Sequence, residues 1–205
     1  MTASPRLWAR TAGVAYLLVI LLGAFAIGVV PNPQGHEQLY RLGLAAHAAV
    51  LSLNMVLAAI FYHLFKVVNR IGAMLVVLFT ILGTAVEGAG LVNQLASYSA
   101  AQVQAAYVIQ QSVFAFYGLT AGYLIYRSTF LPRFVGVLLA IGGLSYLAYS
   151  FTAIIAPSFA DHLVPWIQVP SGVGEISFCL TLLIVGVDVR RWNERAGAAA
   201  FASAG

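Results

Sequence analysis

The sequence predicts an all-α integral membrane protein, a polytopic bundle of six transmembrane helices with both termini in the cytoplasm. Three observations lead to this fold class. Hydrophobic residues make up 61% of the 205-residue chain and charged residues only 8%, whereas about a quarter of the residues in a soluble domain are charged. Six apolar stretches are each close to the ~20 residues with which a helix crosses a bilayer. Nine of the ten lysine and arginine residues fall on one side when these stretches are threaded in order.

The apolar stretches define the spans in order. The first loosely resembles a cleavable signal peptide, but its apolar run continues to Val30, which favours a retained anchor. The last begins at Pro165 or at Pro170, because proline is tolerated in the first turn of a helix. We expect one domain, residues 1–192, followed by a mobile cytoplasmic tail, residues 193–205. The expected spans are residues 11–30, 42–67, 71–96, 104–126, 134–156 and 165–187.

The basic residues predict the orientation. With the amino terminus in the cytoplasm, only Arg41 lies outside, which agrees with the positive-inside bias of membrane proteins. The cytoplasmic set is Arg6, Arg10, Lys66, Arg70, Arg127, Arg133, Arg190, Arg191 and Arg195. This topology explains the net charge of +4 and the pI near 9.4. We therefore expect the lipid bilayer as partner and no nucleic acid.

Two acidic residues lie inside the predicted spans, Glu87 in the third and Glu175 in the last. An ionisable side chain in a span costs roughly 2.5 to 3.5 kcal/mol on insertion scales, so such groups usually face the bundle interior or a wet cavity. Burial favours the neutral form of a carboxyl, which could then donate a proton. The alternative is that each glutamate bonds to a neighbouring helix and only orders the bundle. That alternative gains weight if the last helix begins at Pro170, since Glu175 is then only about 7 Å deep.

Other polar and aromatic side chains gather in the same outer half of the predicted bundle. Helical spacing puts several of them on shared faces. We predict an intramembrane pocket with Glu87 and Glu175 as candidate catalytic residues. The candidate ligand contacts are His47, Asn54, Gln94, Gln110, Tyr117, Tyr149 and Ser171.

The histidines do not indicate a metal or haem site. His47 and His63 lie on one predicted helix, 16 residues apart, and a helix turns such residues to opposite faces. The sequence has no Cys/His cluster, P-loop, nucleophile elbow or H-E-x-x-H pair. We expect no metal and no cofactor, and the sequence leaves open whether the protein is an enzyme.

Several short strings, in order, resemble one known family. They are R-T-A-G at 10–13 with Y-L at 16–17, R-L-G at 41–43, N-R at 69–70, G-Y-L at 122–124 with Y-R-S at 126–128, L-P-R at 131–133 with Gly136, and G-E at 174–175. Over residues 10–187 they resemble the bacterial multi-pass membrane family catalogued as domain of unknown function 4386.

This resemblance implies a six-helix protein of the inner, or plasma, membrane. It also implies that the positions of Glu87 and Glu175 are commonly acidic. Many members have an arginine shortly before the third-span acid, where this chain reads T-I-L-G at 80–83, so a buried Arg–Glu pair is not expected. The family has no established activity, so the resemblance supplies architecture and not function.

Three functions stay open. The favoured one is a pocket for a lipid-soluble or amphipathic small molecule; in one version a protonated glutamate is the general acid for an isoprenoid-like substrate, and aromatic faces stabilise developing positive charge. The second is a non-catalytic scaffold or regulator of another membrane protein, acting in a homo- or hetero-oligomer whose polar residues join helices. The third is a proton-coupled small transporter, although no inverted repeat is evident.

Overall fold

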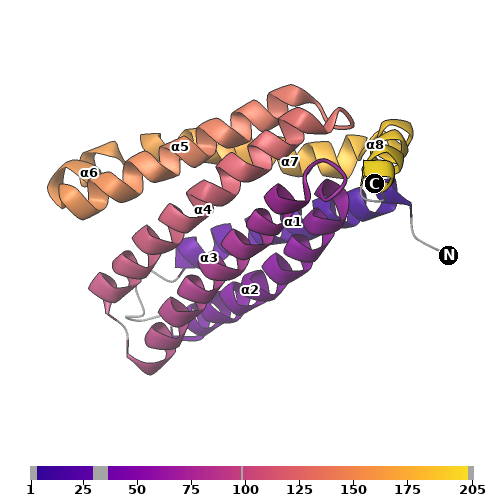
Figure 1. Ribbon diagram of the computed structural model, residues 1–205. Helices are drawn as coiled ribbons and strands as arrows, with labels where there is room; N and C mark the ends of the chain where they lie inside the picture. Colours follow the sequence, from indigo (N-terminus) through magenta and orange to yellow (C-terminus); the bar gives the residue numbers. More distant parts are fainter. Residues whose placement is uncertain (1–3, 30–36, 98, 203–205) are drawn as a thin grey trace.

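The computed structural model describes residues 4–29, 37–97 and 99–202. Within these ranges the regular secondary structure is helical throughout (Figure 1). Six of the helical segments are long and apolar enough to cross a membrane. The predicted fold class, an all-α bundle with six membrane-spanning helices, is confirmed, while the side on which each end lies stays a prediction.

The six spans occur where hydropathy predicts them, but five of the helices begin earlier. The first starts at Pro5 and not at residue 11, and the second at Glu37 and not at residue 42. Hydropathy marks the part of a helix that lies in hydrocarbon, whereas helical hydrogen bonding continues into the polar interface. The spans are α1 (Pro5–Val29), α2 (Glu37–Phe65), α3 (Arg70–Ala96), α4 (Ala100–Ser128), α5 (Arg133–Ile155) and a composite last span of η1 (Trp166–Gln168), α7 (Val169–Leu180) and η2 (Thr181–Val185).

Two further helices stand where the sequence predicts a loop and a tail. The first, α6 (Pro157–Leu163), occupies the predicted loop before the last span. The second, α8 (Val189–Ala202), covers most of the predicted tail of residues 193–205, of which residues 203–205 lie outside the described part. The alanines of this segment explain the difference, because alanine has the highest helix propensity of all residues.

Specific contacts hold α8 across one end of the bundle. Arg191 donates to the carbonyl oxygen of Thr129 over 3.0 Å, and Arg195 donates to that of Arg127 over 2.9 Å. The indole of Trp192 donates to the Leu64 carbonyl oxygen over 3.0 Å. We call this the basic end, since it carries the start of α1, α8 and the basic turns between α2 and α3 and between α4 and α5 (Figure 1). The opposite end is the far end.

The spans form a ring. Neighbours in sequence pack against each other from α1 to α5, α7 packs against α5, and α1 meets the last span. The last of these contacts lies near the basic end, where a Cβ on Gly13 would stand 2.6 Å from the Leu183 nitrogen. Tyr16 and Phe178 meet there with their ring centroids 5.9 Å apart.

The interior of the ring nearer the basic end is filled by packed side chains. Its centre is an aromatic cluster in which the ring of Phe61 lies 5.3 Å from Phe178 and 6.2 Å from Phe65, measured between centroids. These three side chains and Leu64 are at most 2% exposed. The hollow part of the bundle therefore begins beyond this cluster, toward the far end.

Candidate functional site

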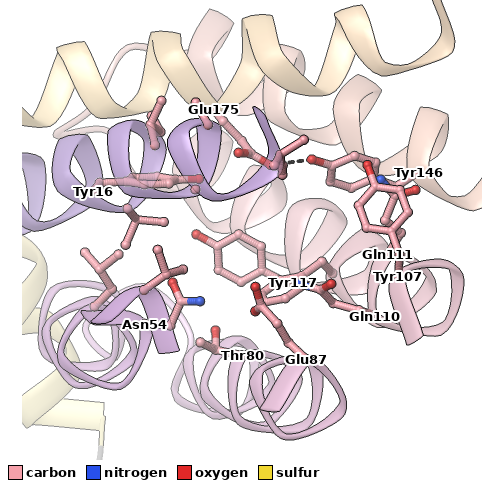
Figure 2. Close-up of a pocket in the computed structure, with 18 of the residues that line it drawn as sticks. Tyr16, Asn54, Thr80, Glu87, Tyr107, Gln110, Gln111, Tyr117, Tyr146 and Glu175 are labelled. Carbon is pink, nitrogen blue, oxygen red and sulfur yellow. Dashed lines mark hydrogen bonds between the residues drawn. The ribbon is translucent and has the colours of Figure 1, made fainter. Parts of the chain in front are cut away.

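The ring of helices encloses a cavity of about 340 Å³, which we call the inner chamber. Residues from α1, α2, α3, α4, α5 and α7 line it (Figure 2). Its apolar wall includes Val19, Ile20, Leu57, Phe61 and Phe114. Its polar lining consists of Tyr16, Asn54, Thr80, Glu87, Tyr107, Gln110, Gln111, Tyr117, Tyr146 and Glu175.

A second cavity of about 420 Å³ adjoins the inner chamber, and we call it the vestibule. The two cavities share Ile27, Glu87, Tyr107 and Gln110 as lining residues. The vestibule reaches Ala100 in the first turn of α4, which puts it nearer the far end. Glu87 thus lies at the junction between the two cavities.

Glu175 faces the inner chamber from α7. The α-helix begins at Val169 after a 3₁₀ turn, so its start is close to the later of the two predicted positions. Glu175 lies six residues beyond it, about 9 Å along the axis. The hydroxyl of Tyr146 donates to Glu175 Oε1 over 3.0 Å (Figure 2). This hydrogen bond links α5 to α7 at the wall of the inner chamber.

Four tyrosines line the inner chamber together with this carboxyl group. Besides Tyr146, they are Tyr16, Tyr107 and Tyr117. The ring of Tyr117 points into the space between Glu175 and Glu87 (Figure 2). The chamber thus combines a carboxyl group, hydroxyl donors and aromatic faces.

Glu87 has a different partner. It lies 17 residues after Arg70, about 26 Å along α3, and its side chain is 9% exposed. His47 Nε2 of α2 contacts Glu87 Oε1. The other oxygen, Oε2, is buried without a hydrogen-bond partner among the described residues. The partner of the Glu87 carboxyl group is therefore a histidine from the neighbouring helix α2.

Five of the seven predicted ligand contacts line the two cavities. Asn54 and Tyr117 line the inner chamber, His47 and Gln94 line the vestibule, and Gln110 lines both. The two predicted catalytic residues line the inner chamber as well. These seven side chains come from four different helices, and the structure brings them together around the two cavities.

The other two predicted contacts, Tyr149 and Ser171, stand behind the wall. Tyr149 is 4% exposed; its hydroxyl accepts a hydrogen bond from Gln104 Nε2 over 3.0 Å, and its ring lies against Tyr107. Ser171 is 3% exposed and donates to the Gln168 carbonyl oxygen over 2.7 Å. Ser171 borders only a small gap of about 10 Å³ beside Glu175. Both residues support lining side chains and neither borders the inner chamber or the vestibule.

Comparison with known proteins adds the family. A family model described as Domain of unknown function (DUF4386) matches residues 11–186. The chain belongs to this family. No curated protein and no solved structure matches it. Membership in DUF4386 therefore agrees with the resemblance in the sequence, and the function has to be argued from the cavities.

Sequence reasoning about this DUF4386 chain missed several lining residues. The most important are Tyr16 and Tyr146, which line the inner chamber with Glu175. The first and fifth spans, on which they lie, carry no acidic residue that would mark an inward face. The signal that could have found them is that Tyr16 and Tyr146 both stand well inside apolar runs, where a buried hydroxyl needs a partner.

Proposed function

We propose that the inner chamber and the vestibule of this DUF4386 protein bind a lipid-soluble or amphipathic small molecule. One observation carries the proposal: both membrane-embedded glutamates line a single cavity, and one of their oxygens has no partner among the described residues. A buried polar atom without a hydrogen bond costs about 1–3 kcal/mol. A bound molecule that satisfies this oxygen would remove that cost.

Size and access favour a ligand from the bilayer. Cavities of about 340 and 420 Å³ lie in the usual range for small-molecule sites, roughly 300–1,000 Å³. On α1, Ala24 and Ile27 line the inner chamber, yet both are exposed on the bundle surface, Ile27 to 68%. The chamber therefore reaches the outer surface along α1, which in a membrane is covered by lipid.

The chamber lining also suits acid catalysis, and this is the finer version of the proposal. Glu175 would be the general acid, with Tyr146 holding one of its oxygens so that the other can face a substrate. The rings of Tyr117 and Phe114 would stabilise positive charge that develops on an isoprenoid-like substrate. This version requires turnover as well as binding.

Transport and scaffolding are less well supported. The aromatic cluster of Phe61, Phe65 and Phe178 fills the bundle between the chamber and the basic end, and a transport path would have to pass it. A scaffold would not need two joined cavities. We further propose that the basic end faces the cytoplasm, as the positive-inside bias requires, so that the vestibule opens toward the outer leaflet of a bacterial inner membrane.

The test identifies the lipids that remain bound to the purified protein. The full chain is purified in mild detergent, and the lipids that remain bound are identified by mass spectrometry. We expect one species enriched over bulk lipid, and roughly tenfold less of it on a Glu175→Gln, Tyr146→Phe variant, because the first change removes the carboxyl group and the second removes the hydroxyl that donates to it. Tyr123→Phe is the control, since that tyrosine is 51% exposed and borders neither cavity.

Two results would reject the binding proposal. The first is the absence of any species above the bulk lipid composition. The second is equal retention by the wild type and the double variant. A chain that purifies empty but always with a second membrane protein would favour the scaffold instead.

A further inference from the structure

We propose that the ligand has a head group that donates hydrogen bonds, an alcohol or an amine, and that this head group binds in the vestibule at Glu87. The inference rests on the proposed function and specifies the chemical class of its ligand. It begins with two acceptor atoms. Glu87 Oε2 and Gln94 Oε1 are buried without a partner among the described residues. Their side chains are only 9% and 8% exposed, and both line the vestibule.

The contact with His47 involves only one oxygen of Glu87. His47 Nε2 and Glu87 Oε1 meet, and Oε2 takes no part in this contact. As a carboxylate oxygen, Oε2 accepts hydrogen bonds. This buried oxygen of a residue at the junction of the two cavities therefore needs a donor.

Gln94 supplies a second acceptor on the same face of α3. It follows Glu87 by seven residues, which is two helical turns, or about 10 Å. A single small group cannot reach both oxygens. A head group with a second hydroxyl or amine, or one that holds a water molecule toward the far end, can satisfy both.

Charge excludes the acidic alternatives. In the described part of the chain, the side chains that line the two cavities include no lysine and no arginine, whereas Glu87 and Glu175 are both present. Phosphate and carboxylate head groups are normally bound by arginine, by lysine or by backbone N–H groups. His47 is the one basic side chain in the described vestibule lining, and it is already in contact with Glu87.

The inner chamber receives the apolar part of the same molecule. Beyond Glu87 its wall includes Leu57, Phe61 and Phe114. A head group at the junction leaves an attached chain directed along this wall. An amphiphile with a donor head group and one short or branched chain fits both cavities.

Four probes with one chain and different head groups test the inference. They are 1-dodecanol, dodecylamine, dodecyl phosphate and dodecanoate, each titrated into the full-length protein in phosphatidylcholine nanodiscs while thermal unfolding is followed by tryptophan fluorescence. We expect the alcohol and the amine to raise the unfolding temperature and the two anions to raise it less or not at all. Glu87→Gln should weaken the amine roughly tenfold or more, because a charge-assisted hydrogen bond is lost.

The matched control is Glu37→Gln, the same chemical change at an exposed glutamate that pairs with Arg41 on the first turn of α2. It should leave all four titrations unchanged. Stronger binding of either anion than of the alcohol and the amine overturns the inference and leaves the binding site standing. Equal amine binding by wild type and Glu87→Gln overturns it too. If none of the four probes shifts the wild-type unfolding temperature, the proposed function itself fails.

Discussion

Substitution of Gly23 by leucine should close the inner chamber without disturbing the fold. Gly23 lines that chamber from α1, and no heavy atom outside its own helix turn lies within 4 Å of the position that a Cβ would take. The Cβ of a leucine at this position therefore enters empty space, and its other three carbons extend from there. They occupy part of a chamber of only about 340 Å³, beside the region into which we direct the ligand's apolar chain.

The expected magnitudes follow from this geometry. Retention of the co-purified ligand should fall at least tenfold, which corresponds to about 1.4 kcal/mol of binding free energy. Stability should stay unchanged or rise, because replacement of glycine in a helix interior gains up to about 1 kcal/mol. For a chain of this size that gain is about 2–4 °C in unfolding temperature. Lipid mass spectrometry and thermal unfolding of the same preparation measure both quantities.

Gly28→Leu is the matched control. Gly28 lies on the same helix, and a Cβ there would also meet nothing within 4 Å, but it is exposed and does not belong to the chamber lining. This variant should keep the ligand in full. Two results would refute the reasoning. If Gly23→Leu retains the ligand in full, the inner chamber is not the binding site. If this variant loses stability, the space beside Gly23 is not empty.

Two further predictions concern packing. Gly136→Ala should destabilise the α4–α5 hairpin by about 1–3 kcal/mol, measured by thermal unfolding, because its Cβ would stand 2.5 Å from the Gly122 carbonyl oxygen; an unchanged unfolding temperature would contradict this close approach. Trp192→Phe should lower the free energy of unfolding by about 0.5–1.5 kcal/mol, since it removes the hydrogen bond to the Leu64 carbonyl oxygen. Proteolysis of α8 should become faster in this variant. Equal proteolysis of variant and wild type would argue that this hydrogen bond does not hold the helix.

The sequence predicted seven of the polar side chains that line the cavities, and the two glutamates show the physical reason. In hydrocarbon a carboxyl group is so costly that its position alone indicates an inward face. Glu87 and Glu175 therefore fixed the inward faces of their own helices. The neighbours at helical spacing, such as Gln94 on α3, followed from these two positions.

The fifth span shows why the remaining lining residues escaped. Tyr146 faces Glu175, whereas Tyr149, three residues later, lies behind the wall. A helix surrounded by lipid on one side and protein on the other is apolar on all sides, so hydrophobic periodicity does not define its rotation. The rotation of α5 is set by its glycines: a Cβ on Gly142 would stand 2.8 Å from the Ser171 Cα. That contact is a tertiary one, and the sequence alone does not reveal it.

The glycines of α1 help to explain why the interior of the bundle is packed around the aromatic cluster and hollow toward the far end. At Gly13 the helix is pressed against the last span, so that a Cβ there would stand 2.6 Å from the Leu183 nitrogen, whereas a Cβ on Gly23 or Gly28 would meet nothing within 4 Å. Small residues let helices associate in lipid only where a partner backbone approaches. Because α1 is packed closely near the basic end and free of close backbone contact at its other glycines, the route that we propose for a lipid-soluble molecule runs along this helix to Glu175 and does not cross the aromatic cluster.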